Sequence, residues 1–281
     1  MFREYVIDPA SLSKWEDIRY VFSIFGWEKG RPITKYPKRW KKLVYDSLNC
    51  SVRDKKRVEE KLRRFKYIVR NNTSYDGKIT WLDNVLSLHA SQAFEKIISV
   101  NDHKNRCVTK MSDLYEDDLH KPTASVRREA SEMADAIKLL LQTATTIKFV
   151  DKHFDPFAPR FQNVMNAMLG LLSQTNYKGT SKIEFYSSSD KSHGQTLCNN
   201  IHEWIITRTS IPVTTIILPF GTMHNRYIIS DKSGITLGTG LDEATRNHTQ
   251  EDDIPILDIQ RHKDLFDEFS SSRKDILYKN S

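Results

Sequence analysis

The spacing of apolar residues changes near Thr145, and this change limits the fold more than any other feature of the sequence. Beyond Thr145, short runs rich in β-branched residues alternate with segments of helical periodicity. Such alternation, followed by short strands close together in the chain, is typical of an α/β fold with a mixed sheet. The expected strands are Ile147–Val150, Lys182–Tyr186, Val213–Leu218, Arg226–Ile229, Ile235–Leu237 and Ile254–Ile259. The expected helices are Phe157–Ser173, Gly194–Thr207 and His262–Tyr278.

The first half of the chain has the apolar spacing of helices throughout. The helices expected there are Pro9–Phe25, Lys38–Leu48, Val52–Val69, Trp81–Ile98 and Ser125–Thr143. A length of 281 residues suits one or two domains. We therefore predict a basic helical domain over residues 1–120, a connecting helix over 121–144 that could belong to either half, and an α/β domain over 145–281.

The net charge of +7 comes from one segment of the chain. Glu28–Arg70 contains sixteen basic and five acidic residues, so it carries +11 and the rest of the chain sums to −4. Aromatic residues lie among these cations, a combination that favours binding to nucleic acid. A solvated helix face and contact with an anionic membrane surface are the alternatives. The candidate nucleic-acid-binding residues are Lys38, Arg39, Lys41, Lys42, Lys55, Lys56, Arg57, Arg63 and Arg64.

Cysteine usage and hydropathy exclude several other classes of protein. The three cysteines are far apart and match neither a disulfide framework nor a zinc-site spacing, which is typical of a reducing compartment. No apolar run approaches the ~20 residues of a membrane helix, and the first residues lack the apolar core of a signal peptide. We expect a cytoplasmic protein with no transmembrane segment and no cofactor. Asp151, His153 and Asp155 have the residue types of a metal site, but a polar loop after a strand needs no metal, so we predict none.

Polar loops follow the first strands of the expected sheet. Ligands of open α/β sheets bind outside the carboxyl ends of the strands, and here those ends lead into Asp151–Asp155 and Ser187–Asp190. After the third strand the chain turns back, so the fourth strand starts at the same edge with Met223–Arg226 and the fifth returns to it as Gly238–Asp242. We therefore expect two acidic loops, a histidine–arginine pair and a small-residue loop to meet at one edge of the sheet.

His224 and Arg226 are two positions apart at the start of a strand, so their side chains share one face. A nucleophile or base beside a cation is suited to displacement at a phosphoryl group. Glycines let the backbone approach an anion closely. The candidate phosphate-binding residues are Gly238, Thr239, Gly240 and Ser188. The plainer interpretation is that His224 caps a surface strand and that Arg226 is a solvated charge.

The stretch from His224 to Asp231 resembles the phospholipase D superfamily signature, H-x-K-x4-D, and Gly238–Gly240 lies where that superfamily has its Gly-Ser segment. The resemblance covers about residues 145–281 and does not extend to the helical half. It implies a mixed-sheet phospholipase D-like domain in which one histidine attacks phosphorus to give a phosphohistidine. A second histidine, from the other half-site, protonates the leaving oxygen, lysines hold the phosphoryl oxygens, and no metal is required.

The chain departs from that pattern in three ways. Arg226 replaces the lysine; it keeps the charge but not the geometry. Only one such motif is present, so a site of the family kind would need two chains around a twofold axis, which predicts a homodimer. Gly238–Asp242 lacks the expected asparagine, and its Gly-Leu-Asp sequence is similar to the phospholipase D-like domain of the MIT-domain protein group, whose members bind ligands or lipid without evident catalysis.

Asp231 cannot orient His224 within one chain, because seven extended residues separate them by about 23 Å. It is expected to shape the turn before Gly234 instead. Asp242 and Glu251 are the candidate carboxylate partners of His224, with Asp151 and Asp155 less favoured. The candidate catalytic residues are His224, Arg226, Asp242 and Glu251.

The leading hypothesis is a homodimeric, metal-independent phosphodiesterase that cleaves DNA or RNA, such as a phage-defence nuclease, with its helical half gripping the phosphate backbone. The rival is a catalytically inactive module of the same fold that binds or serves as a scaffold within a larger nucleic-acid or membrane complex. A lipid phosphodiesterase is a third, weaker possibility.

Overall fold

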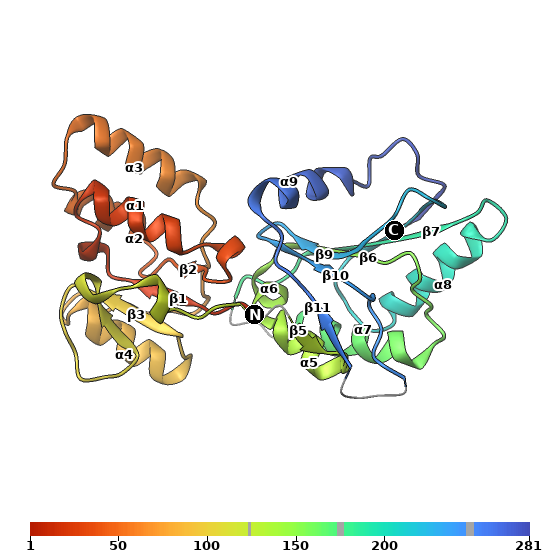
Figure 1. Ribbon diagram of the computed structural model, residues 1–281, viewed down its shortest axis with the longest axis horizontal. Coiled ribbons are helices and arrows are strands. Elements are labelled where there is room, and N and C mark those ends of the chain that lie inside the picture. Colours follow the sequence, from red (N-terminus) through yellow and green to blue (C-terminus); the bar gives the residue numbers. More distant parts are fainter. Residues whose placement is uncertain (123–124, 173–176, 246–249) are drawn as a thin grey trace. The chain divides into compact units, whose positions relative to one another are not determined.

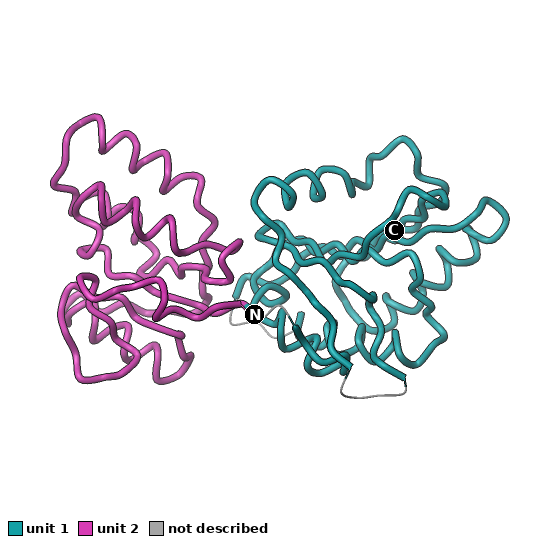
Figure 2. The backbone as a smooth tube through the Cα atoms, viewed as in Figure 1, with its two compact units in different colours: residues 1, 123–281 teal, residues 2–122 magenta. Residues whose placement is uncertain are grey.

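The computed structural model describes residues 1–122, 125–172, 177–245 and 250–281. The chain divides into two compact units, one formed by Phe2–Pro122 and the other by Thr123–Ser281 together with Met1 (Figures 1 and 2). We call them the N-terminal unit and the C-terminal unit and describe each by itself. Among the described residues, none of the helices combines the length and the apolar character needed to cross a bilayer.

The N-terminal unit is built around a four-stranded parallel sheet in the order β2-β1-β3-β4. Its strands are β1 (Tyr5–Ile7), β2 (Ile33–Thr34), β3 (Lys96–Ser99) and β4 (Val108–Lys110). The prediction of a helical N-terminal domain is therefore wrong, since this unit is itself α/β. Strands of two to four residues are too short to display an alternating pattern, so the sequence periodicity missed them.

Four α-helices accompany this sheet: α1 (Trp15–Ile24), α2 (Trp40–Ser47), α3 (Val52–Arg64) and α4 (Trp81–Ser91). Short 3₁₀ helices lie at Pro9–Ser11, Trp27–Lys29, Met111–Asp113 and Glu116–Asp118. The hydroxyl of Ser51 accepts a hydrogen bond from the amide of Asp54 and so caps α3. Apolar residues of α1, α2 and α3 pack with Tyr5 and Ile7 of the sheet into one buried core. Several cationic side chains of α2 and α3, among them Lys42, Lys56 and Arg63, are left exposed.

The C-terminal unit contains a six-stranded mixed sheet in the order β10-β9-β6-β7-β8-β12. Its strands are β6 (Thr146–Val150), β7 (Lys182–Ser189), β8 (Val213–Pro219), β9 (Arg226–Ser230), β10 (Gly234–Leu237) and β12 (Tyr278–Asn280). Strands β6, β7 and β8 run parallel, whereas β9, β10 and β12 are each antiparallel to their neighbours. The predicted mixed α/β sheet and five of its expected strands are confirmed.

Other elements of the C-terminal unit differ from the expected ones. The sixth strand, expected at Ile254–Ile259, is reduced to one bridge between Ile256 and Ile235. Instead β11 (Glu251–Asp253) pairs with β5 (Ser125–Arg127) in a separate two-stranded sheet. The single helix expected to end at Thr143 is divided into β5, α5 (Ala130–Ala136) and α6 (Lys138–Thr143). Residues 123–124 of the expected connecting helix lie outside the described residues.

Three longer helices cover the sheet: α7 (Pro159–Leu172), α8 (Gly194–Ile206) and α9 (Ile259–Glu268). Figure 1 shows α9 on one face of the sheet and α7 and α8 on the other. The last helix ends at Glu268, and the chain then returns to the sheet as β12, so the expected helix to Tyr278 is about half as long as predicted. Ser173, the expected last residue of α7, lies outside the described residues.

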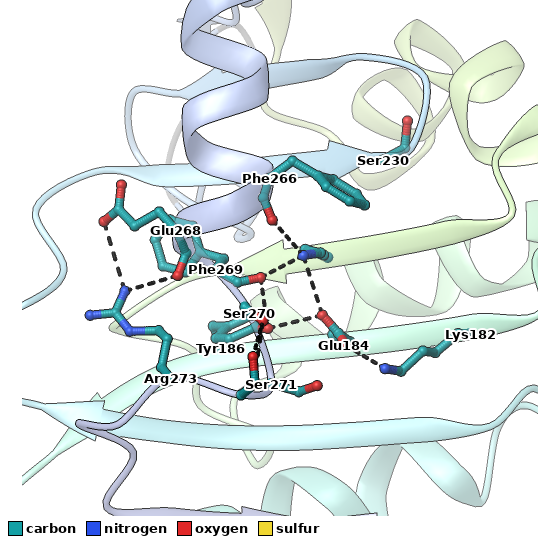
Figure 3. Close-up of polar contacts among 12 residues, drawn as sticks. Lys182, Glu184, Tyr186, Ser230, Phe266, Glu268, Phe269, Ser270, Ser271 and Arg273 are labelled. Atoms are coloured by element: carbon teal, nitrogen blue, oxygen red, sulfur yellow. Dashed lines mark hydrogen bonds and ion pairs between the residues drawn. The ribbon is translucent and has the colours of Figure 1, made fainter.

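A buried polar cluster joins the sheet to the C-terminal end of α9 (Figure 3). The ammonium of Lys148 donates to the carbonyls of Phe266 and Phe269 at 2.7 and 2.5 Å, and lies 3.6 Å from Oε2 of Glu184. The hydroxyl of Tyr186 lies 2.9 Å from Glu184 Oε2 and from the Phe269 carbonyl. Because the last carbonyls of a helix lack partners within it, Lys148 acts as a buried cap of α9.

Candidate functional site

The candidate site lies at the edge of the C-terminal sheet where β6, β7 and β8 end and β9 begins. We call this the carboxyl edge. Val150 at the end of β6 pairs with Tyr227, so Asp151 comes opposite Arg226 in the next position of the antiparallel pair. Leu237 pairs with Arg226, so Gly238 follows at the same edge. The expected convergence of the loops after β6, β7 and β10 with the His224–Arg226 segment is therefore confirmed.

Three polar residues form a row across neighbouring strands on the sheet face that α7 and α8 cover. Arg226 is opposite Asp151, and Asp151 follows the Val150–Tyr186 pair, which places Ser187 on its other side. Ser188 alternates with Ser187, so it belongs to the opposite face, with Tyr186 of the α9 cluster. The prediction of Ser188 as a phosphate-binding residue at this site is therefore corrected, because Ser187 shares the face of Arg226.

Asp151 is fully buried at the centre of this row. Its Oδ1 accepts a hydrogen bond from the amide of His153 at 2.8 Å, and its Oδ2 accepts one from the amide of Leu241 at 2.7 Å. Burial raises the pKa of Asp151, and the two amides and the Arg226 charge oppose that rise only in part. Sequence reasoning gave Asp151 little weight; its position directly after a buried strand was the signal that could have identified it.

The small-residue loop Gly238–Asp242 binds two carboxylates of its own chain. The amide and hydroxyl of Thr239 donate to Oδ2 of Asp252 at 3.1 and 2.9 Å, and the amide of Leu241 donates to Asp151. Gly240 has φ +129°, and a Cβ there would lie 2.8 Å from Asp151 Oδ2. The Thr239 and Leu241 amides are therefore engaged by carboxylates, so the Thr239 amide is not held ready for a phosphate as predicted. Phosphate binding by Gly238 and Gly240 stays a prediction.

His224 lies on the loop that joins β8 to β9, and its side chain is exposed. Within the described part of the chain its imidazole has no hydrogen-bond partner. Arg226 is half-buried, and its Nη1 donates to the carbonyl of Gly238 at 3.3 Å. The Nε of Arg226 and the hydroxyl of Ser187 are both buried without a hydrogen-bond partner among the described residues. The edge therefore combines an accessible imidazole with a positioned guanidinium.

The two carboxylates predicted to partner His224 are engaged elsewhere. Asp242 forms ion pairs with Arg128 at 2.9 Å and with Arg160 at 3.6 Å. Glu251, on β11, accepts a 2.5 Å hydrogen bond from the hydroxyl of Ser125. Asp242 therefore pairs with Arg128 and Arg160 in the structure, a role that the sequence did not indicate.

Asp231 lies at the opposite edge of the sheet, as the distance argument predicted. Its Oδ1 accepts hydrogen bonds from the amides of Thr145 and Thr146 at 2.7 and 3.3 Å. Its carboxylate also pairs with the ammonium of Lys232 at 3.0 Å. Although burial opposes it, Lys232 and the two amides keep the pKa of Asp231 below its ordinary value. Asp231 therefore anchors the turn between β9 and β10 to the start of β6.

The predicted nucleic-acid-binding residues lie on α2, on α3 and just before α2 in the N-terminal unit. Within the described residues, five of them are exposed and have no ion pair: Lys38, Arg39, Lys42, Lys56 and Arg63. Arg57 pairs with Asp54 at 3.1 Å and Arg64 with Glu60 at 2.6 Å. Lys55 is half-buried, as is Lys41, whose ammonium lies 4.7 Å from the centre of the Tyr67 ring. We call the five unpaired cations the basic surface.

In the described ranges, no three side chains of histidine, cysteine, aspartate or glutamate come together in a way that could hold a metal ion. Asp151 is bound to backbone amides, and the side chains of His153 and Asp155 are exposed.

Comparisons with known proteins name no family for this chain. No protein-family model matches it, and neither does any curated protein. Among solved structures, it is similar to one described as TrmBL2, an archaeal chromatin protein that shows a novel mode of DNA binding. That similarity has a TM-score of 0.31 at 11% sequence identity and covers 85% of this chain and 70% of the other.

Proposed function

We propose that this chain is a phospholipase D-like phosphodiesterase that cleaves nucleic acid as a homodimer without a metal ion. The observation that carries the proposal is the exposed imidazole of His224, two residues before the half-buried Arg226 at the carboxyl edge. A histidine free of internal partners can attack phosphorus, and a nearby guanidinium can neutralise the charge that builds on the phosphoryl oxygens.

In the proposed reaction His224 is the nucleophile. Its ring nitrogen forms a bond to phosphorus as the bond to the leaving oxygen breaks, and the leaving oxygen takes a proton from the His224 of a second copy. Water then attacks the phosphohistidine and gives its proton to that second histidine, which restores both side chains. Two copies are needed because each chain carries one His-x-Arg motif.

Arg226 would hold the phosphoryl group during both steps. Its guanidinium is oriented by the Gly238 carbonyl, and the buried Asp151 attracts it from the adjacent strand. Such supports keep a charged group in place while the substrate's charge changes, which is how electrostatic stabilisation of a transition state is preorganised. Asp151 and Gly238 are positioning residues in this scheme.

The basic surface on the N-terminal unit would bind the phosphate backbone. Its five cations have no ion pair among the described residues, so they can be neutralised by phosphates without breaking an internal salt bridge. This part of the proposal makes binding strongly dependent on salt, while the chemistry at His224 remains independent of divalent ions.

Incubation with single- and double-stranded DNA in EDTA tests the proposal. We expect cleavage by the wild type, no cleavage by His224→Ala, and unchanged cleavage by His193→Ala, which removes another exposed histidine from the same edge. Thermal melting would verify that each variant is folded, and light scattering would give the number of chains. Equal cleavage by wild type and His224→Ala would disprove the mechanism.

The second candidate is a non-catalytic binding module of the same fold. One observation favours it. The amides of Thr239 and Leu241 donate to Asp252 and Asp151 of the same chain, so these two donors are already used within the protein. A protein of this kind would bind DNA, or an anionic membrane in a larger complex, and leave it intact. Salt-sensitive binding with no product after prolonged incubation would support it over the enzyme.

A further inference from the structure

Two phenylalanines at the carboxyl edge are exposed to an extent unusual for such large apolar side chains. Phe157 is 70% exposed and Phe220 is 65% exposed. Phe157 lies in the loop that follows β6, and Phe220 directly follows Pro219 at the end of β8. Both rings therefore belong to the edge that carries His224, which is four residues beyond Phe220 on the same loop.

The loop that carries Phe157 is packed against the sheet, yet the Phe157 ring itself stays exposed. Phe154, three residues earlier, is only 2% exposed and contacts Phe185 of the sheet with ring centres 4.6 Å apart. Hydrogen bonds hold the backbone next to Phe157, whose amide donates to Oδ1 of Asp155 at 2.9 Å, while the Pro156 carbonyl accepts from Gln162 at 2.7 Å. Phe154 thus anchors this loop to the sheet, and the loop holds the Phe157 side chain in an exposed position.

Phe220 is displayed in a comparable way on the other side of the edge. It precedes Gly221, which has φ +85°, in a turn closed by the amide and hydroxyl of Thr222, both of which donate to the Pro219 carbonyl. Since β7 lies between β6 and β8, the two strand ends are about 10 Å apart. The two loops that carry the rings therefore start from strands that are not neighbours, so the rings can contact two different groups of one bound molecule.

The charges at this edge indicate which molecule. Arg226 and the 47% exposed Arg160, which also pairs with Asp242, supply cations at this edge, and Lys191 is exposed after β7. A polymer that presents phosphates and flat aromatic groups in alternation satisfies both features at once, because each base has a face on which an aromatic ring can stack. In a duplex those faces are covered by neighbouring base pairs, so only an unpaired strand offers them.

We propose that Phe157 and Phe220 are stacking platforms for unpaired bases of a single-stranded nucleic acid whose phosphodiester lies at His224 and Arg226. The proposal rests on the proposed function and specifies its substrate: single strands are bound at the carboxyl edge, and duplexes are bound there more weakly. The two phenylalanines determine specificity and take no part in the chemistry.

Fluorescence anisotropy with three labelled probes of equal length tests this: a single strand, a duplex, and a strand whose bases are replaced by abasic sites. Phe157→Ala and Phe220→Ala should each weaken binding of the single strand about 5- to 100-fold and leave the abasic strand unaffected. Phe157→Trp should restore binding. Ile259→Ala is the matched control, since Ile259 is 66% exposed at the start of α9, near the opposite edge, and its loss should change nothing.

Each possible result decides the question. Single-strand binding that is unchanged in both alanine variants, or that falls equally for the abasic strand, overturns the proposal. The proposal would also be overturned if the two alanine variants lost binding to anionic vesicles and kept their binding to DNA, a result that would favour membrane insertion. Cleavage is scored separately in EDTA: base-dependent binding without cleavage supports the platforms and defeats the proposed catalysis, whereas cleavage of single strands unaffected by both substitutions does the reverse.

Discussion

The amide of Leu241 donates a 2.7 Å hydrogen bond to Oδ2 of Asp151, and this bond ties the loop after β10 to the end of β6. The two residues are distant in the sequence, yet their contact holds the loop against the strand that faces Arg226. The Gly238–Asp242 loop and the row of polar residues are therefore connected, and a substitution in one should alter the structure of the other.

Asp151→Asn tests the strength of that connection. An amide side chain cannot accept from both the His153 and Leu241 amides, so we expect a loss of about 1–3 kcal/mol in the free energy of unfolding. Urea denaturation would measure it. Asp155→Asn provides a control, because Asp155 is exposed and its substitution should have an effect within about 0.5 kcal/mol.

The same variant carries a pH signature. Burial raises the pKa of Asp151 in the folded protein above its ordinary value of 3.8, so the folded state holds the proton more tightly than the unfolded state. The stability that comes from this protonated group is complete below pH 3.8 and is lost as the pH rises through the folded pKa. Asparagine does not titrate, so the stability gap between wild type and variant should narrow as the pH rises from 4 to 8; a constant gap would contradict the assignment.

Gly240→Ala and Gly170→Ala should have opposite effects on stability. At Gly240, φ is +129° and a Cβ would lie 2.8 Å from Asp151 Oδ2, so we expect a loss of about 1–3 kcal/mol. At Gly170, within α7, a Cβ would meet no atom within 4 Å among the described residues, apart from the chain neighbours and the helix's own backbone, so alanine should gain up to about 1 kcal/mol. Thermal melting gives the change in melting temperature of each variant relative to the wild type. Equal changes in the two variants would refute the strained conformation at Gly240.

Lys148→Met should loosen the C-terminal end of α9. The thioether cannot donate to the carbonyls of Phe266 and Phe269, and Glu184 loses a buried partner, so we expect a loss of roughly 2–4 kcal/mol. Lys182→Met removes another lysine bound to Glu184, but its side chain is 41% exposed, so its loss should amount to less than about 1 kcal/mol. Figure 3 shows the contact between Lys182 and Glu184.

Burial also lowers the pKa of Lys148 below its ordinary value of 10.5, despite the opposing attraction of Glu184. The folded state therefore releases this proton at a lower pH than the unfolded state does. As the pH rises from the folded pKa towards 10.5, Lys148 should therefore increase the free energy of unfolding. Chemical denaturation between pH 7 and pH 10 should record this gain in the wild type and not in Lys148→Met. The same slope in both proteins would show that another group is responsible.

The basic surface predicts a specific salt dependence. If it contacts the phosphates of single-stranded DNA, each contact contributes about 0.7 to the slope of log affinity against log salt concentration. Replacing Lys38, Arg39 and Lys42 by glutamine should therefore reduce the slope by up to about 2. Arg57→Gln and Arg64→Gln should reduce it less, because their guanidinium groups are already paired with Asp54 and Glu60. An unchanged slope in the triple variant would exclude the surface from binding.

The sequence predicted best where strands are long and apolar. β8 was expected because its run of β-branched residues is bounded by turn residues, and its expected start at Val213 is also where the strand begins. In the N-terminal unit the apolar spacing of α4 continues through Ile97 and Ile98, with no glycine or proline to end the helix, so β3 was absorbed into it. Local pattern cannot reveal a strand of four residues whose stability comes from partners elsewhere in the chain.

The site was predicted in its location and only partly in its contacts. Tracing of the strands brought His224, Arg226 and Gly238 to one edge, because that follows from chain direction alone. The choice between Ser187 and Ser188 depends on a register of one residue, which reverses the face of every side chain. The capture of the Thr239 amide by Asp252 depends on β11 lying beside the loop, and no local feature of the sequence announces that position.

The position of β1 in the N-terminal sheet bears on how this protein is made. Tyr5 pairs with Ile33 on one side and with Lys96 on the other, so an early segment of the chain forms an inner strand of its sheet. During synthesis β1 leaves the ribosome long before β3 and β4 do, and its second edge stays unpaired until they appear. A ribosome stalled before residue 96 should therefore carry a nascent chain that proteases cut readily, and protection should begin only after β4 has emerged.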